Sequence, residues 1–180
     1  MINKDAFSSG QMGSKLWLCQ ELEQLKWSSK LTWIYGGWYG VTALLLLSRE
    51  KFKVTRIESY DIDPECQYIA DMINENWVCD NWKFKAHTED CSALIANDPD
   101  LIINTSTEHF DSMDWFNNIP SGKKVILQGN NMPHDDHVVH SETLESFINH
   151  YPLAEYSYQG TKEFVYPTWE FSRYMLIGIK

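Results

Sequence analysis

Paired cysteines are absent from this 180-residue chain, although it contains four cysteines. No two of them form a C-x-x-C pair, and all lie in segments that we predict to be structured, so a disulfide framework is not indicated. We expect reduced, mostly buried thiols in a cytoplasmic protein. The four are Cys19, Cys66, Cys79 and Cys91. The hydrophobic content of 43% is enough for a core that needs no disulfide or metal staple.

The chain also lacks a long hydrophobic run. Its longest aliphatic stretch, Val41 to Leu47, is far too short to span a bilayer, and the N-terminal MINKDAFSSGQ has no apolar signal core. It contains no internal repeat, no low-complexity tract and no linker rich in Pro, Gly or Ser. We therefore expect a single domain over residues 1–180 that does not associate with a membrane.

Positive charge is scarce, because 15 Lys and Arg stand against 25 Asp and Glu, giving a formal net charge of −10. Binding to duplex nucleic acid depends mainly on Lys and Arg that neutralise phosphates, so a nucleic-acid partner is disfavoured, although a local basic patch can exist in an acidic protein. The composition favours a soluble protein that acts on a small molecule.

The chain does have a regular alternation of helix-like and strand-like segments. A first helix is predicted to start near Ser14, because Leu18, Leu22 and Leu25 share one helical face. Helix-like segments separate most of five strand candidates, which predicts a parallel sheet covered on both faces. The strand candidates are residues 31–35, 53–60, 82–86, 101–105 and 124–128.

The C-terminal region breaks this alternation. Residues 153–165 and 171–179 both have strand character, and only a short PTWE connection separates them. No crossover helix fits there, so the two strands must pair antiparallel. One reversed strand is therefore expected in an otherwise parallel sheet.

The stretch IYGGWYG, residues 34–40, lies where the first predicted strand ends and a helix begins. Glycines at such a junction allow the backbone to approach a ligand. A dinucleotide site needs G-x-G-x-x-G spacing, with its second glycine free to approach a pyrophosphate. Here that spacing is missing and Trp38 stands near the second glycine, so NAD is disfavoured.

Acidic residues follow the second predicted strand, in RIESYDIDPECQ. Asp61 lies 21 residues after Gly40, the usual distance for an acid that binds a ribose. Asp63 is explained differently, since Pro64 suits the first helical position and makes Asp63 the N-cap. We therefore expect Asp61 to be the acceptor for ligand hydroxyls.

The next two predicted strands also end in polar residues. HTEDCS contains Asp90, and NTSTEH contains Asn104, Glu108 and His109. In open α/β sheets ligands bind beyond the carboxyl ends of the strands, so both segments are candidates for the site.

In this order the landmarks resemble the class I S-adenosylmethionine-dependent methyltransferases, and the resemblance extends from the first helix to RYMLIGIK. The chain is also similar to small methyltransferase-like proteins of tailed bacteriophages. The resemblance implies a Rossmann-like, doubly wound α/β fold with a mostly parallel seven-stranded sheet and one antiparallel C-terminal strand. It further implies S-adenosyl-L-methionine as cofactor.

The resemblance assigns individual roles within the cofactor site. Asp61 is expected to bind both ribose hydroxyls, and Asp90 the adenine amino group unless Asp90 or Ser92 only caps a short helix. Lys15 either reaches the ligand carboxylate or is a solvated residue at the helix start. The loop expected to wrap the cofactor comprises Tyr35, Gly36, Gly37, Trp38 and Gly40.

Two positions depart from the family's D-x-G-x-G-x-G loop. Ile34 stands where the acid belongs, and Trp38 stands where the middle glycine belongs. Trp38 would either push backbone and ligand apart or stack on the ligand.

Glu108 and His109 are the candidates for proton transfer, since a protonated methyl acceptor needs a positioned base. The alternative is that Glu108 caps the following segment FDSMDWF and His109 packs beneath it. Asn104 is a candidate to hydrogen-bond a nitrogen nucleophile, although NTS is not the NPPY pattern of amino-methylating enzymes.

The segment 133–140, PHDDHVVH, has three histidines at intervals of three. Histidine and aspartate are good metal ligands, but the segment has no strong helical or strand framework to fix ligand geometry. We predict a solvated loop without a metal, in which His137 faces the substrate.

The leading functional prediction is methyl transfer to an acceptor that is either small or presented with the help of a second subunit in a homodimer. The alternative is a catalytically silent domain that keeps the fold to bind the cofactor or a partner protein.

Overall fold

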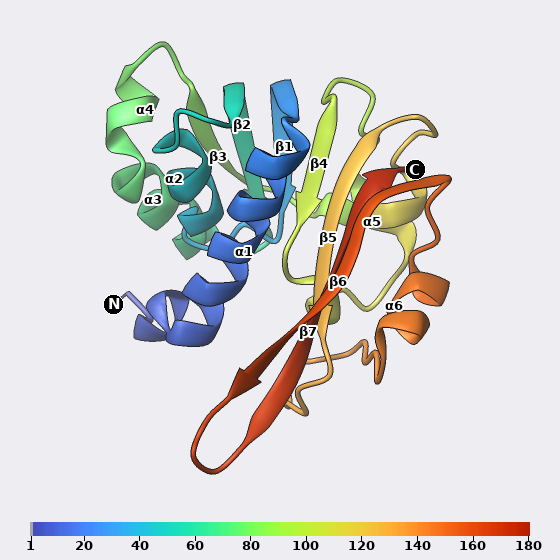
Figure 1. Cartoon of the computed structure of the whole chain (residues 1–180). Helices are drawn as coiled ribbons and strands as arrows, with labels where there is room; N and C mark the ends of the chain where they lie inside the picture. Colours follow the sequence, from blue (N-terminus) through green and yellow to red (C-terminus); the bar gives the residue numbers. More distant parts are fainter. Residues whose placement is uncertain (1) are drawn as a thin grey trace.

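The computed structural model describes residues 2–180, and all of its strands belong to one sheet (Figure 1). The strands are β1 (Ser28–Tyr35), β2 (Lys53–Asp61), β3 (Phe84–Thr88), β4 (Leu101–Asn104), β5 (Lys124–Asn130), β6 (Glu155–Val165) and β7 (Glu170–Ile179). The helices are α1 (Ser9–Leu25), α2 (Val41–Leu47), α3 (Pro64–Ile73), α4 (Glu75–Cys79), α5 (Asp114–Asn117) and α6 (Leu144–His150). Short 3-10 helices are η1 (Lys4–Phe7), η2 (Cys91–Ala93) and η3 (Thr107–His109).

The strand order is β3-β2-β1-β4-β5-β7-β6. The strands from β3 to β5 pair in parallel, whereas β7 is antiparallel to both β5 and β6. This order confirms the predicted seven-stranded sheet with one reversed strand near the C-terminus. The reversed strand is β7, which enters the sheet between β5 and β6 after a tight turn.

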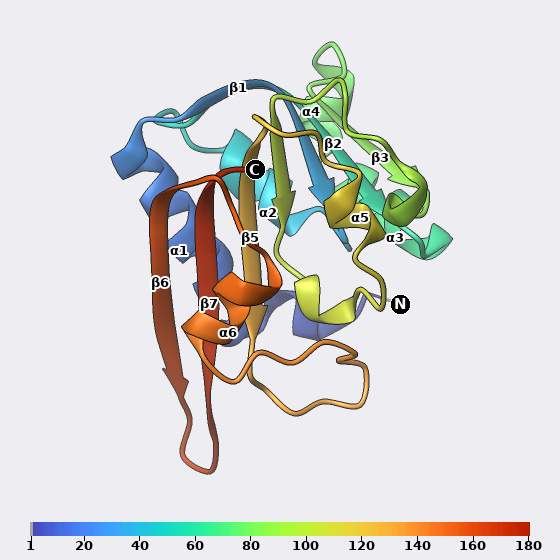
Figure 2. The ribbon, with the colours of Figure 1, turned by 90° about the vertical axis from the view of Figure 1, so that its right-hand side faces the viewer.

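Helices cover both faces of the sheet, as a doubly wound fold requires. Leu18 of α1 and Leu46 of α2 pack with Ile34 on one face, whereas Trp115 of α5 and Phe147 of α6 belong to the core on the other. Figures 1 and 2 show α1 and α6 on opposite faces of the C-terminal strands. Neighbouring residues of β1, β4, β5 and β7 alternate between the two cores, which is why these strands are apolar on both sides.

The predicted boundaries differ from the observed ones by up to three residues in the strands and by more in the first helix. Helix α1 begins at Ser9, well before Ser14, because η1 precedes it and the Ser8 hydroxyl accepts a hydrogen bond from the Gln11 backbone N–H. Strand β3 begins at Phe84, because Trp82 has a φ of 57° that no strand can include. The other predicted strands agree with the observed ones to within about three residues.

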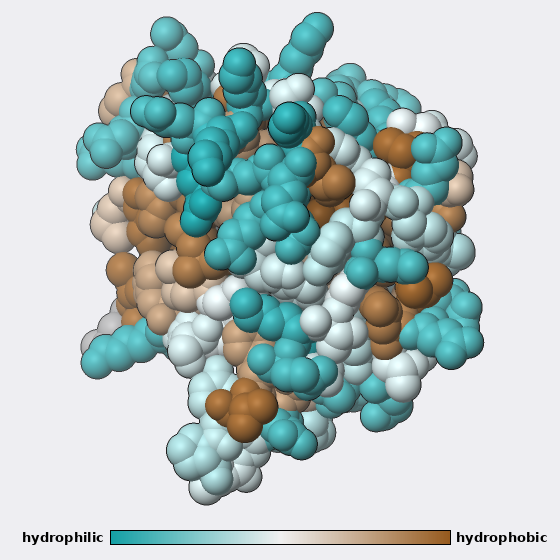
Figure 3. Space-filling view, in the orientation of Figure 1, coloured by the Kyte–Doolittle hydropathy of each residue, from teal (hydrophilic) through white to brown (hydrophobic). Residues whose placement is uncertain are grey.

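The surface and the cysteines can be compared with the sequence predictions. On the face in Figure 3, hydrophilic side chains cover most of the top and centre, and apolar side chains gather at the left. All four cysteines are free, and all except Cys79 are buried. Within residues 2–180, no helix combines the length and apolarity needed to cross a lipid bilayer.

Candidate functional site

A cleft of about 680 Å³ opens at the carboxyl ends of the parallel strands. Its walls are the segments that follow β1 to β5, together with residues from η1 and α1. In open α/β sheets this is the edge at which ligands bind. Within residues 2–180, six acidic side chains line the cleft, and no Lys or Arg lines it. The acids are Asp5, Asp61, Glu89, Asp90, Asp111 and Asp136.

The glycine loop between β1 and α2 takes left-handed backbone conformations at three alternate positions. The φ angles are 59° at Gly36, 48° at Trp38 and 69° at Gly40. A Cβ at Gly40 would lie 2.6 Å from the Asn74 Nδ2, so that position is closed to other residues. Trp38 is the only one of the three that is not glycine. It adopts the left-handed conformation at the position where the family pattern has its middle glycine, although its Cβ makes that conformation unfavourable. Its side chain packs against Tyr39 and borders the cleft.

Asp61 at the end of β2 fixes this loop. Its Oδ2 accepts a hydrogen bond from the Trp38 backbone N–H at 2.8 Å, and its Oδ1 accepts one from the Asp63 backbone N–H at 3.1 Å. Each carboxylate oxygen can accept more than one hydrogen bond, and Asp61 borders the cleft. Asp63 caps α3 by accepting from the Glu65 backbone N–H at 2.9 Å, which confirms its predicted structural role. Sequence reasoning missed the structural role of Asp61.

Asp90 caps a short helix and also borders the cleft, so the two interpretations of this residue do not exclude one another. Its Oδ1 accepts a hydrogen bond from the Ser92 backbone N–H at 2.8 Å and caps η2, and its side chain also borders the cleft. The structural role is therefore shown. Contact of Asp90 with an adenine amino group stays a prediction.

Lys15 is buried, so the interpretation of this residue as a solvated helix-start residue was wrong. Because α1 begins at Ser9, Lys15 lies well inside the helix, where its side chain is 7% exposed. Its Nζ donates a hydrogen bond to the Gln11 Oε1 at 2.6 Å and borders a small cavity beneath the glycine loop. Burial, assisted by the positive charge of Arg173, lowers the pKa of the Lys15 ammonium from 10.5 to about 7.

Tyr35 and Asn104 are buried beneath the cleft and do not line it. The Tyr35 ring packs edge-on against Trp115 in the core, so Tyr35 can contribute only backbone atoms to a ligand site. The Asn104 Oδ1 accepts a hydrogen bond from the Ser106 backbone N–H at 2.9 Å, which fixes the turn after β4. The placement of Asn104 does not support its predicted hydrogen bond to a nucleophile, and the place of Tyr35 in the cofactor loop is limited to its backbone.

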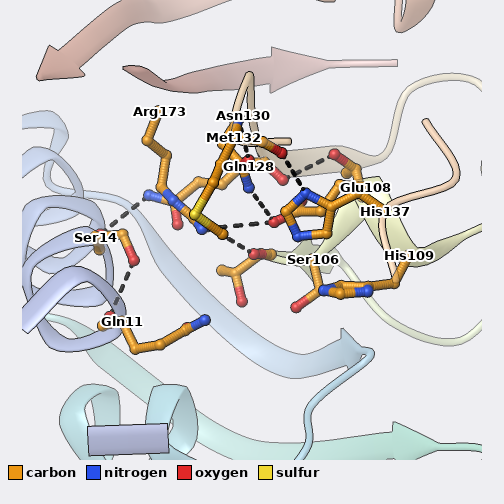
Figure 4. A network of polar contacts seen from close by, with 12 residues as sticks. Gln11, Ser14, Ser106, Glu108, His109, Gln128, Asn130, Met132, His137 and Arg173 are labelled. Carbon is orange, nitrogen blue, oxygen red and sulfur yellow. Dashed lines mark hydrogen bonds and ion pairs between the residues drawn. The ribbon is translucent and has the colours of Figure 1, made fainter. Parts of the chain in front are cut away.

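Glu108 is the centre of a buried polar network (Figure 4). Its side chain is 3% exposed, and its Oε1 accepts a hydrogen bond from the Asn130 Nδ2 and lies 3.5 Å from the Arg173 Nη2. Arg173 in turn donates from Nη1 to the Thr105 backbone oxygen at 3.1 Å. The Oε2 of Glu108 is buried without a hydrogen-bond partner.

This arrangement contradicts the interpretation of Glu108 as a helix cap. The N-cap of α5 is Met113, and the side chain of Glu108 points to β5 and β7 instead. The backbone oxygen of Glu108 accepts from Val138 and Val139, at 2.9 and 3.2 Å. Glu108 therefore ties the histidine-containing loop, residues 133–140, to η3.

The two histidines nearest Glu108 both line the cleft, but His109 contradicts its alternative interpretation and His137 is more buried than predicted. His109 is exposed and does not pack beneath the following segment, and its Nδ1 lies 3.1 Å from the Asp136 backbone oxygen. His137 is only 8% exposed, so the loop is not entirely solvated. Its Nδ1 lies 2.8 Å from the Met132 backbone oxygen, and burial lowers the pKa of its imidazole. The two rings meet edge to face with centroids 4.9 Å apart.

Sequence reasoning missed Asn130 and Arg173. Asn130 extends β5 two residues past its predicted end, and Arg173 interrupts the apolar strand FSRYMLIGI of β7. The one signal in the sequence is a cation inside an apolar strand, because such a cation needs a buried partner. Its partner, Glu108, lies 65 residues away in the sequence.

No model of a known protein family matches the chain, and no curated protein sequence matches it. Solved structures match it in fold. The N-methyltransferase NodS from Bradyrhizobium japonicum WM9, in complex with S-adenosyl-L-homocysteine, matches with a TM-score of 0.70 and 11% identity over 94% of this chain and 88% of that one.

Two other matches have similar extents. The YcgJ protein from Bacillus subtilis gives a TM-score of 0.67 with 13% identity over 93% of this chain and 98% of that one. Magnesium protoporphyrin IX methyltransferase ChlM from Synechocystis PCC 6803, with bound S-adenosyl-L-homocysteine, gives 0.64 with 10% identity over 98% of this chain and 88% of that one. The chain therefore has the class I methyltransferase fold, and the similarity to bacteriophage proteins stays a prediction.

Proposed function

We propose that this protein binds S-adenosyl-L-methionine in the cleft and transfers its methyl group to an acceptor. The observation that carries the proposal is the glycine loop, whose backbone is left-handed at Gly36, Trp38 and Gly40 and is held by the Asp61 carboxylate. The fold is that of NodS and ChlM, both solved with S-adenosyl-L-homocysteine bound. A fold of this type carries many activities, so the proposal depends on the loop and the cleft as well.

The charges of the cleft support this cofactor over a phosphate-containing one. S-adenosyl-L-methionine is a sulfonium cation without phosphate, whereas NAD carries a pyrophosphate. Six acidic side chains line the cleft and favour a cation over an anion. The cofactor's own carboxylate needs a cationic partner, and Lys15 beneath the glycine loop is the proposed one.

The remaining groups of the cofactor have proposed partners at successive strand ends. The ribose hydroxyls would donate to Asp61, whose oxygens retain acceptor capacity beyond the two backbone hydrogen bonds. The adenine would lie near Asp90 with its amino group donating to that carboxylate. Trp38 borders the cleft and would stack on the ligand instead of excluding it.

Methyl transfer is a direct displacement in which the bond from sulfur to the methyl carbon breaks as the bond to the acceptor forms, and S-adenosyl-L-homocysteine leaves. An acceptor that carries a proton must lose it to a base. We assign this role to His109, which lines the cleft, or to Glu108, which is buried next to His109 and His137 and whose Oε2 has no other partner. The acceptor is a small molecule, or one presented with the help of a second copy of the chain.

The second candidate function is a catalytically silent domain that binds the cofactor or a partner protein. The observation that favours it is the contact of Glu108 with Asn130 and Arg173, which gives this buried carboxylate a structural role without any chemistry. A silent domain would bind the cofactor and transfer nothing.

The two functions are separated by incubating the protein with methyl-labelled S-adenosyl-L-methionine and fractionated cell extracts. An enzyme transfers label to a distinct fraction, and the Asp61→Asn variant, which weakens the proposed ribose contact but keeps one acceptor oxygen for the loop, transfers less. With the acceptor in hand, Glu108→Gln should lower turnover by about 10²-fold if Glu108 is the base. Binding of the cofactor without transfer in any extract would favour the silent domain.

A further inference from the structure

Three potential metal ligands meet at the edge of the cleft, Glu108, His109 and His137. One ligand atom from each lies within 4.8 Å of the other two. Figure 4 shows the two histidines beside one another next to Glu108. The sequence does not reveal this group, because His137 lies 28 residues after His109.

The hydrogen bonds of both histidines fix the same tautomer. The Nδ1 of His109 faces the Asp136 backbone oxygen, and the Nδ1 of His137 faces the Met132 backbone oxygen. A carbonyl oxygen only accepts, so each Nδ1 carries the proton and each Nε2 keeps a free lone pair. Metal-binding histidines in proteins are oriented in the same way, with the other ring N–H donated to a carbonyl or carboxylate.

Glu108 is prepared in a comparable manner. Its Oε1 is held by Asn130 and Arg173, whereas its Oε2 is buried without a partner. A buried carboxylate oxygen without a hydrogen bond is costly, unless a ligand or ion satisfies it. Each of the three residues therefore has one polar atom bound to the protein and a second one unused.

The loop of residues 133–140 has a framework that the sequence did not indicate. The backbone N–H groups of Val138 and Val139 both donate to the Glu108 backbone oxygen, at 2.9 and 3.2 Å. His137 is thereby held next to the residue whose carboxylate completes the group. The prediction of a loop without metal depended on the lack of a framework that could fix ligand geometry, and these two hydrogen bonds provide one.

We propose that Glu108, His109 and His137 bind a divalent transition-metal ion such as Zn²⁺ or Co²⁺. The ion would use the lone pairs that Glu108 or His109 needs as a base, so it would compete with that role. Two imidazoles and one carboxylate are a common ligand set for such ions and leave at least one coordination position open to water or to a ligand in the cleft. Two imidazoles disfavour Mg²⁺ and Ca²⁺, which prefer oxygen ligands. The acidic lining of the cleft favours accumulation of cations there.

Binding requires a small contraction of the group. Ligand atoms at about 2.1 Å from a metal are separated by about 3 to 3.5 Å, whereas the separations here extend up to 4.8 Å. His109 can supply the movement because its side chain is exposed, whereas Glu108 and His137 are buried.

The test is a titration of the metal-free protein with Co²⁺, followed by its visible absorption bands, and with Zn²⁺ in a calorimeter. We expect one ion per chain. His109→Ala and His137→Ala should each weaken binding by at least about 10-fold. His134→Ala is the matched control, since His134 belongs to the same loop but not to the group, and it should leave affinity unchanged.

Thermal unfolding separates loss of the site from loss of the fold. At a fixed Zn²⁺ concentration of about ten times the wild-type Kd, the Tm should rise equally in the wild-type protein and in His134→Ala, and clearly less in His109→Ala, whose exposed side chain makes it the variant least prone to misfold. Absence of Zn²⁺ and Co²⁺ binding would overturn the proposal. Equal weakening by His134→Ala and His137→Ala would also overturn it, because the ion would then be bound by the exposed loop.

Discussion

The Asp61 carboxylate accepts a hydrogen bond from the backbone N–H of Trp38 at 2.8 Å. This contact joins the end of β2 to the glycine loop after β1 and holds Trp38 at a φ of 48°. The residue proposed to bind the ribose therefore also shapes the loop that would surround the cofactor. A substitution that removes both functions at once cannot separate them.

Asp61→Asn separates the ribose contact from the support of the loop better than Asp61→Ala does. Asparagine loses the charge but keeps one acceptor oxygen for the loop. The affinity for S-adenosyl-L-homocysteine should fall by about 1.5–3 kcal/mol, the range for charge-assisted hydrogen bonds, as measured by calorimetry. Asp63→Ala should instead lower the free energy of unfolding by about 1 kcal/mol through the lost cap and leave affinity nearly unchanged. A larger loss of affinity in Asp63→Ala would show that the two roles are reversed.

Trp38→Gly and Trp38→Ala form a matched pair that tests the left-handed loop. Both remove the indole, so its contact with Tyr39 is lost equally. Only alanine retains a Cβ at a φ of 48°, and the glycine variant should therefore be more stable by about 1 kcal/mol in urea unfolding. Equal stability, or a more stable alanine variant, would mean that Trp38 is not left-handed in solution.

Lys15 predicts a proton linkage for cofactor binding. Its pKa of about 7 leaves it mostly neutral at pH 8.5, and a ligand carboxylate beside it would raise that pKa, so binding should take up a proton. Calorimetry in two buffers of different ionisation enthalpy measures this uptake, which Lys15→Met should abolish. The charged groups that also act on Lys15 are Arg173, Glu108 and Asp5. Wild-type binding without proton uptake would exclude Lys15 as the partner of the carboxylate.

The same residue predicts a pH dependence of stability without ligand. The folded pKa of Lys15, about 7, lies below its ordinary value of 10.5, so the unfolded chain binds more protons between these pH values. The free energy of unfolding contributed by Lys15 therefore rises with pH across this window and is lowest below pH 7. Lys15→Met should gain most stability over the wild type at the low end of this window.

The buried pair of Glu108 and Arg173 predicts a non-additive double mutant. Arg173→Met should destabilise the protein by about 3 kcal/mol, because it leaves a buried carboxylate without its cation. Combination with Glu108→Gln should recover part of that loss, since no charge is then left unpaired. Urea unfolding of the four proteins completes the cycle, and strictly additive losses would show that the two side chains do not interact.

The sequence predicted the sheet well because the order of β and α segments, the PTWE turn and the cap at Asp63 are all local features. Hydrophobic periodicity and turn residues report local structure directly. The sequence also indicated that the polar residues after β2, β3 and β4 would lie at one edge of the sheet, because the carboxyl ends of parallel strands meet at the same edge.

The burial of Lys15 and the partners of Glu108 depend on contacts between segments that are distant in the sequence, so they could not be predicted from it. The position of Lys15 is one example, because η1 and the Ser8 cap place the start of α1 before it and so make it an interior residue of a buried helix face. The partners of Glu108 come from β5 and β7, and His137 reaches it through backbone hydrogen bonds of a loop without periodicity. No local pattern encodes such contacts.

The central claim is tested most directly by calorimetric titration of the purified protein with S-adenosyl-L-homocysteine, with NAD as the comparison ligand. The acidic cleft and the Asp61-held loop predict saturable binding of one S-adenosyl-L-homocysteine per chain and no heat from NAD. Absence of binding by S-adenosyl-L-homocysteine together with clear binding of NAD would contradict the account.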